Sequence, residues 1–285
     1  MPSYNRKEIE LNNIIIESDN LIAMNRLLEK YRGQIDVMPI DPPYNTCIEN
    51  IGYRDNDEKW LSFMEERLLV AKKLLSNTGV MFIHIDESEY CRLYSLCMSI
   101  FGKENITSMI WKKTNELFDK NRKEKPLESG IRRTHEFIVV CFKDKKNTTL
   151  KMIKQPCLIN GQLIDVEKPM ETIIDFMGTT SSAKDEIEAL LEDRAIFSTP
   201  KPVKLIKEFI RSATDKSSIV MDFFAGSGTT GHATMELNSE DGGERKFILI
   251  TNSEHDICKR VTIPRIRRAM EINNLNTCLL QIEKF

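Results

Sequence analysis

The sequence has few of the features that mark a membrane, secreted or zinc-binding protein. No stretch of its 285 residues approaches the roughly 20 apolar residues that a membrane span needs. The first residues, MPSYNRKEIELNN, lack the apolar core of a signal peptide. There are only four histidines, and the seven cysteines are odd in number and never spaced as CxxC. These absences predict a cytoplasmic protein with reduced cysteines, no membrane contact and no metal site.

The net charge of −2 gives no general sign of a nucleic-acid-binding protein. Two segments are nevertheless basic. The segment from Lys112 to Arg133 contains eight Lys/Arg and four Asp/Glu. A second group lies near the C-terminus and comprises Lys259, Arg260, Arg265, Arg267 and Arg268. Such patches suit contact with phosphate groups, but a solvated helix face and a charged loop would explain them equally well.

The hydrophobic pattern indicates an α/β fold with a largely parallel sheet, because short apolar runs alternate with amphipathic helical stretches. The length allows one large domain with a smaller insertion. Strands are expected at residues 14–18, 35–40, 80–85, 137–142, 218–222 and 246–251. Helices are expected at 20–31, 60–75, 87–101, 202–213, 230–237 and 254–269. The polar segment 114–133 is predicted to be a loop, and the weaker alternation over 143–194 indicates an inserted subdomain.

A glycine-rich turn, DFFAGSGTT, occupies residues 222–230 between a predicted strand and a predicted helix. Glycine lets a backbone turn tightly and approach a ligand, and the start of the following helix favours negative charge. The turn is not the complete GxGxxG fingerprint of dinucleotide-binding proteins. It also lacks the lysine that follows the glycines in the phosphate-binding loop of nucleoside triphosphatases. Taken alone, it is also compatible with a tight strand-to-helix turn that binds nothing.

The tetrapeptide Asp41-Pro42-Pro43-Tyr44 follows the strand expected at 35–40. Open α/β sheets bind ligands at this end of their strands. Proline fixes φ at about −65°, so the Asp41 carboxylate and the Pro42 carbonyl can form a rigid pair of hydrogen-bond acceptors. Accepting both hydrogens of an exocyclic amine would draw its nitrogen towards tetrahedral geometry and free its lone pair, provided that Asp41 is ionised. Tyr44 offers an aromatic face to a flipped base. A proline-rich turn with an incidental tyrosine is the simpler alternative.

Read together, the two motifs resemble the β group of adenine-N6 DNA methyltransferases, which are related to type III modification (Mod) subunits. In that group the catalytic motif precedes the cofactor motif and target recognition lies between them, as in this sequence. The similarity extends through the segments GVMFIHID, RTHEF, FSTPKPVKLIKEFI and RKFILITN, and so covers nearly the whole chain. It implies a Rossmann-like, S-adenosylmethionine-dependent methyltransferase sheet with helices on both faces and a small inserted target-recognition region.

The resemblance also assigns site residues. The catalytic residues would be Asp41, Pro42, Pro43 and Tyr44. The loop around the methionine part of S-adenosylmethionine would comprise Phe223, Ala225, Gly226, Ser227 and Gly228, with Asp222 beneath it. Thr199 and Lys201 would bind the carboxylate end of the cofactor, where Lys201 can neutralise its charge, although a lysine at a helix start is as reasonable. Asp19 would accept a hydrogen bond from the cofactor's adenine, with N-capping of the next helix as the alternative.

Two positions depart from the family pattern. Many relatives carry an acidic residue after the strand that follows the glycine turn, whereas this sequence has Asn252 there, so that Asn252 or Glu254 would bind the ribose. Cys47 stands where relatives often have glycine. His84 is interpreted as a satisfied core residue, and His135-Glu136 as structural or loop-anchoring.

The implied activity is methylation of the N6 amine of a flipped adenine in double-stranded DNA. The chain would divide into a catalytic part (1–113), a target-recognition region (114–195) whose strand 137–142 returns to the sheet, and a cofactor-binding part (196–285). Arg122, Arg132 and Arg133 are the candidate DNA contacts. By analogy, a second copy of the chain and a restriction subunit are candidate partners.

Three alternatives remain at this stage. Cytosine-N4 enzymes use the same amine geometry but usually have serine in place of Asp41. RNA or protein-glutamine amines are further targets, for which asparagine commonly stands at this position. A catalytically idle DNA-binding subunit could retain the fold, although both motifs are intact.

Overall fold

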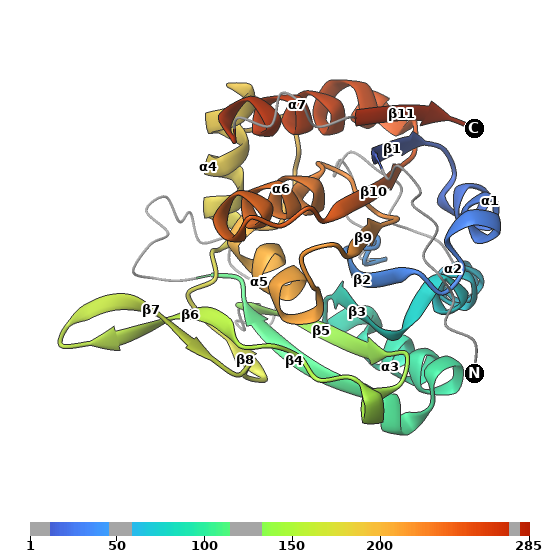
Figure 1. Cartoon of the computed structure of the whole chain (residues 1–285), viewed down its shortest axis with the longest axis horizontal. Helices are drawn as coiled ribbons and strands as arrows, with labels where there is room; N and C mark the ends of the chain where they lie inside the picture. Colours follow the sequence, from blue (N-terminus) through green and yellow to red (C-terminus); the bar gives the residue numbers. More distant parts are fainter. Residues whose placement is uncertain (1–11, 46–58, 115–132, 274–279) are drawn as a thin grey trace.

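The computed structural model describes residues 12–45, 59–114, 133–273 and 280–285 (Figure 1). Within them, nine strands form one sheet in the order β11-β1-β10-β9-β2-β3-β5-β4-β8. These strands are β1 (Asn13–Glu17), β2 (Ile35–Ile40), β3 (Leu75–Ile85), β4 (Ile106–Lys112), β5 (His135–Phe142), β8 (Ile173–Ile174), β9 (Ile219–Asp222), β10 (Lys246–Thr251) and β11 (Leu280–Lys284). The principal helices are α1 (Asn20–Tyr31), α2 (Trp60–Leu74), α3 (Glu87–Phe101), α4 (Thr180–Leu191), α5 (Val203–Ala213), α6 (Thr229–Asp241) and α7 (Ile263–Ile272).

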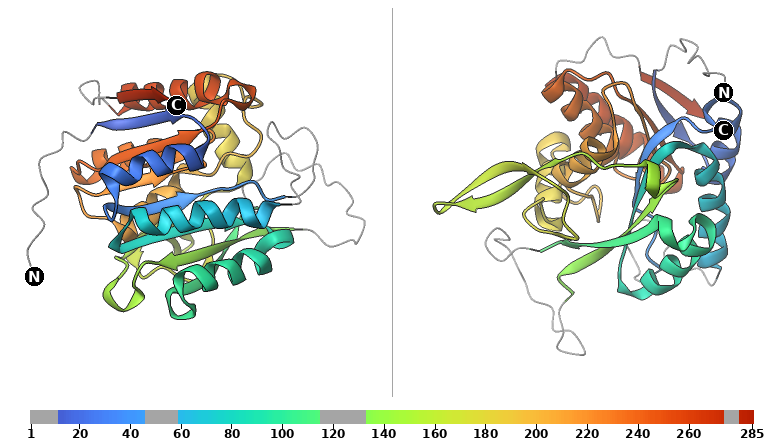
Figure 2. Two further views of the ribbon diagram at one scale, coloured as in Figure 1. Left: turned by 90° about the vertical axis from the view of Figure 1, so that its right-hand side faces the viewer. Right: turned by 60° about the horizontal axis from the view of Figure 1, so that its bottom comes forward.

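Helices cover both faces of the sheet, as Figure 2 shows. Apolar side chains of α1, α2 and α3 pack against one face, and those of α5, α6 and α7 pack against the other. The central strands are therefore buried on both sides. This explains why β1, β9 and β10 are continuous apolar runs without the alternation of a half-exposed strand. The expected α/β architecture with a largely parallel sheet is confirmed.

The strand order brings the two motifs together. β2 and β9 are parallel neighbours, with Val37 opposite Val220. The residues that follow them, Asp41 and Phe223, therefore leave the sheet at the same edge, where α/β proteins bind ligands. β5 runs antiparallel to both β3 and β4, so its first residues lie where its two neighbours end. Glu136, which pairs with Trp111, is thus brought to this same edge.

Some boundaries differ from the sequence-based prediction. The strands β4 and β11 were not expected, and β11 pairs with β1 from the opposite end of the chain. β3 begins at Leu75 and runs through the Asn77-Thr78-Gly79 segment. The expected helix over 254–269 is broken into a 3₁₀ turn (Glu254–Asp256), a π-helical turn (Cys258–Thr262) and α7. Among the described residues, no helix combines the length and the apolar composition required to cross a membrane.

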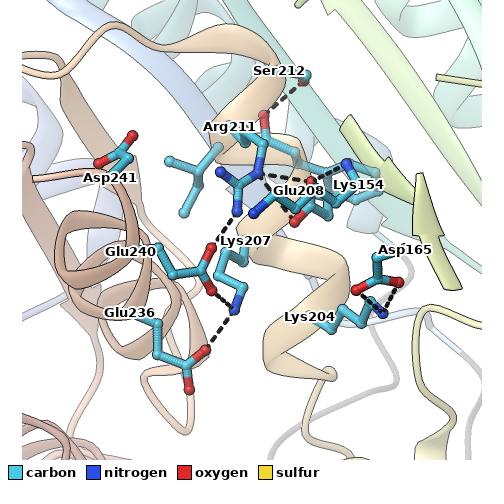
Figure 3. Close-up of polar contacts among 12 residues, drawn as sticks. Lys154, Asp165, Lys204, Lys207, Glu208, Arg211, Ser212, Glu236, Glu240 and Asp241 are labelled. Carbon is cyan, nitrogen blue, oxygen red and sulfur yellow. Dashed lines mark hydrogen bonds and ion pairs between the residues drawn. The ribbon is translucent and has the colours of Figure 1, made fainter. Parts of the chain in front are cut away.

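The segment 143–194 contains a projecting hairpin, formed by β6 (Ile153–Ile159) and β7 (Gln162–Lys168), followed by β8 and α4 (Figures 1 and 2). The hairpin is fixed to α5 at its base and at mid-length. A carboxylate oxygen of Glu208 accepts the Lys154 N–H at 2.8 Å, and Lys204 pairs with Asp165 at 2.9 Å (Figure 3). Figure 3 also shows α5 bound to α6 through ion pairs of its basic side chains with Glu236 and Glu240.

Candidate active site

A pocket of about 350 Å³ lies between the two motifs at the carboxyl edge of the sheet. Its walls come from the segments after β1, β2, β9 and β10 and from the loop before α5. Most of the predicted site residues line it, namely Asp19, Asp41, Pro43, Thr199, Lys201, Asp222, Phe223, Ala225, Gly226, Ser227 and Asn252. Pro42, Tyr44 and Gly228 flank these residues in the chain without forming the wall.

The Asp-Pro-Pro-Tyr segment is fixed from two helices. The indole N–H of Trp60, at the start of α2, donates to the Pro43 carbonyl at 2.7 Å. The Ser88 hydroxyl, in the first turn of α3, donates to the Tyr44 carbonyl at 3.1 Å. Trp60 is itself buried, so the segment is positioned by the core as well as by the stiffness of its two prolines.

Four polar side chains lie in contact with one another at the Asp-Pro-Pro-Tyr segment. We call them the charge cluster: Asp41, Tyr44, Glu136 and Lys201. The Lys201 ammonium lies 2.8 Å from Asp41 Oδ2 and 3.3 Å from Glu136 Oε2, and it donates to the Tyr44 hydroxyl at 2.9 Å. The Tyr44 hydroxyl lies 2.6 Å from Asp41 Oδ1 and 2.9 Å from Glu136 Oε2. Since this hydroxyl has one hydrogen, it can donate to one carboxylate at a time.

Burial gives the members of the charge cluster different protonation behaviour. Burial raises the pKa of Asp41, and the charge of Glu136 adds to that effect against the opposing ammonium of Lys201. Burial acts in the same direction on Glu136, but the ammonium groups of Lys201 and Lys113 outweigh it and lower the pKa of Glu136 to about 2. Burial and the two carboxylates raise the pKa of Tyr44 well above 10. At neutral pH Glu136 is therefore charged and Tyr44 is protonated, whereas the pKa of Asp41 lies above its ordinary value.

The glycine turn supplies the opposite wall. Gly226 and Gly228 have φ values of +45° and +81°, which L side chains rarely adopt. A Cβ on Gly226 would lie 3.0 Å from the ring of Phe197, so this backbone approaches the pocket without room for a side chain. Asp222 begins the turn and accepts hydrogen bonds from the Phe224 N–H at 2.9 Å and the Thr230 hydroxyl at 2.6 Å.

Asp222 provides a prediction on pH. Burial raises its pKa from the ordinary 3.8 to about 7, although the hydrogen bonds from Thr230 and Phe224 oppose the shift. Between these values the folded state holds a proton that the unfolded chain has released, so the stability contributed by the protonated group is lost as pH rises from about 4 to about 7. We expect the free energy of unfolding of the wild type to fall relative to that of D222N between pH 5 and pH 8, measured by urea denaturation. An identical pH response of the two proteins would contradict this assignment.

Arg265 is hydrogen-bonded to residues of the glycine turn. From the sequence it was wrongly grouped with the basic residues near the C-terminus. It is completely buried, and its guanidinium donates to the hydroxyls of Ser227 at 3.0 Å and Thr229 at 2.9 Å. Burial lowers its pKa to about 10. Lys259, Arg260, Arg267 and Arg268 are exposed. One arginine of the group therefore faces inward because every third or fourth residue of an α-helix faces the core.

The remaining predicted cofactor contacts lie at the far side of the pocket. Asp19 caps α1 by accepting the N–H groups of Leu21 and Ile22, and it also pairs with Arg67 at 3.0 Å. Capping, the alternative weighed for Asp19, is therefore observed, while its side chain still lines the pocket. Asn252 follows β10, and its side-chain oxygen accepts the Glu254 N–H at 3.3 Å. Both Asn252 and Glu254 line the pocket.

Of the predicted DNA contacts, Arg133 lies within the residues that the structure describes. Its side chain is exposed and pairs with Asp86 at 3.5 Å and with Glu87 at 3.4 Å. Arg122 and Arg132, together with Cys47, lie outside the described residues.

Some contributors to the site were not predicted from the sequence. Glu136 was interpreted as structural, yet its carboxylate belongs to the charge cluster. His84 is buried as predicted, but its ring nitrogens have no hydrogen-bond partner among the described residues. Asn20 was not singled out, although its side-chain amide donates to the Phe223 carbonyl at 2.8 Å and so fixes the glycine turn to α1. The Thr-His-Glu-Phe segment at a strand start was the available signal for Glu136.

Comparison with known proteins agrees with this geometry. Residues 35–261, which contain both motifs, match the family described as DNA methylase. The chain belongs to this family. It is 28% identical to the StyLTI Mod subunit, a type III restriction-modification enzyme of Salmonella typhimurium (strain LT2), in an alignment that covers 84% of this chain and 52% of that protein. The expected relationship to Mod subunits is confirmed, and the chain spans about half the length of this relative.

Solved structures of two proteins named as a DNA modification methylase and a DNA methyltransferase share the fold. One is TTHA0409 from Thermus thermophilus, complexed with S-adenosyl-L-methionine, which is 14% identical to this chain. The two structures superimpose with a TM-score of 0.58 over 95% of this chain and 98% of the TTHA0409 chain. The cytosine-N4-specific PvuII DNA methyltransferase is 15% identical, also with a TM-score of 0.58, and covers 96% of this chain and 95% of its own. At such identities the likeness concerns the fold, and it confirms the expected Rossmann-like methyltransferase sheet.

Proposed function

We propose that this member of the DNA methylase family transfers a methyl group from S-adenosylmethionine to the N6 amine of an adenine flipped out of double-stranded DNA. The observation that carries the proposal is the convergence of Asp41 and the glycine turn on one pocket, although they are separated by about 180 residues of sequence. A half-buried carboxylate that lines a ligand pocket is an arrangement suited to chemistry on an amine.

The pocket fits this cofactor. Its volume of about 350 Å³ lies within the roughly 300–1,000 Å³ of small-molecule sites. Gly226 and Phe197 both line the pocket, and they lie so close together that a Cβ on Gly226 would be 3.0 Å from the Phe197 ring. Oxygen acceptors at the far side, on Asp19, Asn252 and Glu254, suit an adenine amine and ribose hydroxyls. We therefore assign the cofactor's nucleoside end to these residues and its methionine end to the glycine turn.

When bound, S-adenosylmethionine supplies a methyl group attached to a positively charged sulfur, so the amine needs alignment more than activation by a strong base. Asp41 would accept hydrogens of the amine. Each of its oxygens already has one partner in the charge cluster and keeps a second acceptor position for the substrate. Because Lys201 pairs with Asp41 and Glu136, we place it at the catalytic carboxylate and leave contact with the cofactor's carboxylate as a further prediction.

The aromatic ring of Tyr44 is proposed to stack on the flipped base. In the described structure its hydroxyl is held by Asp41 and Glu136, and the Lys201 ammonium lies 5.2 Å from its ring centre. Flipping costs a few kcal/mol of unstacking and unpairing, so contacts elsewhere must offset it. Arg122, Arg132 and Arg133 remain the proposed DNA contacts, within a target-recognition region over 114–195.

Adenine is favoured over cytosine by the aspartate itself, because cytosine-N4 enzymes usually carry serine at this position. The shared fold of the cytosine-N4-specific PvuII enzyme does not discriminate between these two amines. A second copy of the chain and a restriction subunit remain predicted partners, and the cytoplasmic location remains a prediction.

The decisive assay is transfer of tritiated methyl from S-adenosylmethionine to unmethylated plasmid DNA, followed by mass analysis of the nucleosides. We expect N6-methyladenine as the product. N4-methylcytosine as the product would contradict adenine as the target and identify the cytosine N4 amine instead. Incorporation of methyl into RNA or protein alone would contradict a DNA substrate. If the protein binds the cofactor but transfers no methyl to any of these substrates, the idle-subunit alternative holds.

A further inference from the structure

The charge cluster contains a residue to which neither the motifs nor the comparisons give a role. Glu136 is the second residue of β5 and is only 6% exposed. Its neighbours along the strand, from Phe137 to Phe142, are apolar, so a carboxylate at this position is not required by sheet packing. A buried charge costs several kcal/mol unless it is paired and hydrogen-bonded. Oε2 of this side chain contacts Tyr44 and Lys201, two other members of the charge cluster.

Four groups face the Glu136 carboxylate, and each comes from a different element. Tyr44 Oη, after β2, and Lys201 Nζ, before α5, approach Oε2 at 2.9 and 3.3 Å. The Lys113 ammonium, after β4, approaches Oε1 at 3.3 Å. The His84 ring, on β3, lies 4.0 Å from Oε2. Burial and the charge of Lys201 lower the pKa of His84 to about 3, so this ring is neutral near pH 7.

When Asp41 is ionised, the charges on four of these side chains balance. Lys113 and Lys201 supply two positive charges, and Asp41 and Glu136 supply two negative charges. Lys201 is shared between the carboxylates, at 2.8 Å from Asp41 and 3.3 Å from Glu136. If the charge of Glu136 were removed, Lys201 would retain Asp41 as its single anionic partner in the cluster. The catalytic carboxylate would then be held more tightly by the ammonium and would be a weaker acceptor for a substrate amine.

On the basis of the proposed function, we propose that Glu136 is a positioning residue for methyl transfer, which holds Lys201 and Tyr44 so that Asp41 is aligned and available to the amine. Glu136 acts through its neighbours, since Tyr44 and Lys201 lie between its carboxylate and that of Asp41. The substrate's N6 amine contacts Asp41, and Glu136 sets the geometry and the electrostatic potential at that contact.

The test compares E136Q, E136D and a matched control. E208Q is the control, because Glu208 is also a buried glutamate (2% exposed) that pairs with a cation, Arg211 at 2.9 Å, but lies on α5 at the hairpin and outside the pocket (Figure 3). For E136Q we expect kcat to fall roughly 100-fold, as for other losses of alignment in a reactive geometry. The KM for DNA and the Kd for S-adenosylhomocysteine should stay within about threefold of the wild type, since the residue touches neither ligand. E136D should recover at least about tenfold of the lost rate by restoring the charge.

The pH profile separates positioning from a structural role. The negative charge of Glu136 helps to raise the pKa of Asp41, so its removal lowers that pKa. Because Asp41 must be ionised, the acidic limb of the kcat profile should move to lower pH in E136Q and stay in place in E208Q. A kcat of E136Q within threefold of the wild type, or a loss that follows only thermal unfolding and is shared by E208Q, would overturn the proposal.

A second measurement is independent of turnover. In protein labelled with carboxyl-¹³C aspartate, the Asp41 resonance is identified by its absence in D41N, and its titration is compared between wild type and E136Q. We expect a lower midpoint in E136Q. A wild type that methylates no DNA would contradict the proposed function alone, whereas an unchanged Asp41 titration would overturn the role of Glu136.

Discussion

Replacing Asp41 by asparagine should reduce methyl transfer by about 10³-fold or more while leaving cofactor affinity within about threefold of the wild type. The substitution keeps the size of the side chain but removes its charge and one of its two acceptor oxygens. The new amide N–H₂ would face the Lys201 ammonium or the Tyr44 hydroxyl, both of which donate to Asp41 in the wild type. Single-turnover methylation of plasmid DNA measures the rate, and calorimetry with S-adenosylhomocysteine measures the affinity.

The structure offers a matched control for this substitution. The side chain of Asp175 is 29% exposed and pairs with Lys112 at 3.1 Å, while that of Asp41 is 27% exposed and pairs with Lys201 at 2.8 Å. Asp175 does not line the pocket. D175N should therefore keep its rate within about threefold, in line with the small contribution of an exposed ion pair. Near-normal turnover by D41N, or equal losses in both variants, would contradict the role assigned to Asp41.

Replacing Gly226 by valine should weaken cofactor binding by roughly 100-fold. A β-branched residue at φ +45° is strained by about 1–3 kcal/mol, and its Cβ would lie 3.0 Å from the ring of Phe197. The turn can relieve both effects only by moving away from its present position against the pocket. Calorimetric titration with S-adenosylhomocysteine gives the Kd, and urea denaturation reports the free energy of unfolding.

Gly242 separates backbone strain from the loss of the binding surface. Its φ is +67°, and a Cβ there would meet no atom within 4 Å. It ends α6 and does not line the pocket. G242V should lose stability from the same kind of strain while keeping the Kd of the wild type. If both glycine variants bound the cofactor as tightly as the wild type, the glycine turn would not be the cofactor-binding loop.

The sequence alone was sufficient to predict those helices and strands whose own residues form a clear apolar pattern. α3 is predicted at its observed bounds because its apolar positions follow one helical stripe and Asp86 caps its start. β2 and β10 are mainly apolar segments of strand length, and they too were predicted correctly. Elements stabilised mainly by distant partners were missed. β11 (LQIEK) has no buried residue and depends on pairing with β1, more than 260 residues earlier.

The same distinction applies to the candidate site. The Asp-Pro-Pro-Tyr motif and the glycine turn are local and could be read directly from the sequence. The charge cluster could not, because Glu136 reaches Asp41 only through the antiparallel direction of β5 between β3 and β4. A pattern of apolar residues predicts that a strand exists but not its direction. Arg265 was likewise assigned to the surface because the inward face of α7 is set by packing against α6.

The most direct measurement is a crystal structure of the protein with sinefungin, an analogue that carries an amine in place of the transferable methyl group. We expect the ligand to lie in the pocket between the glycine turn and Asp41, with its nucleoside end near Asp19 and Asn252 and its amine directed towards the charge cluster. Sinefungin bound elsewhere, or with its amine turned away from Asp41, would contradict the claim that the two motifs form one methyl-transfer site.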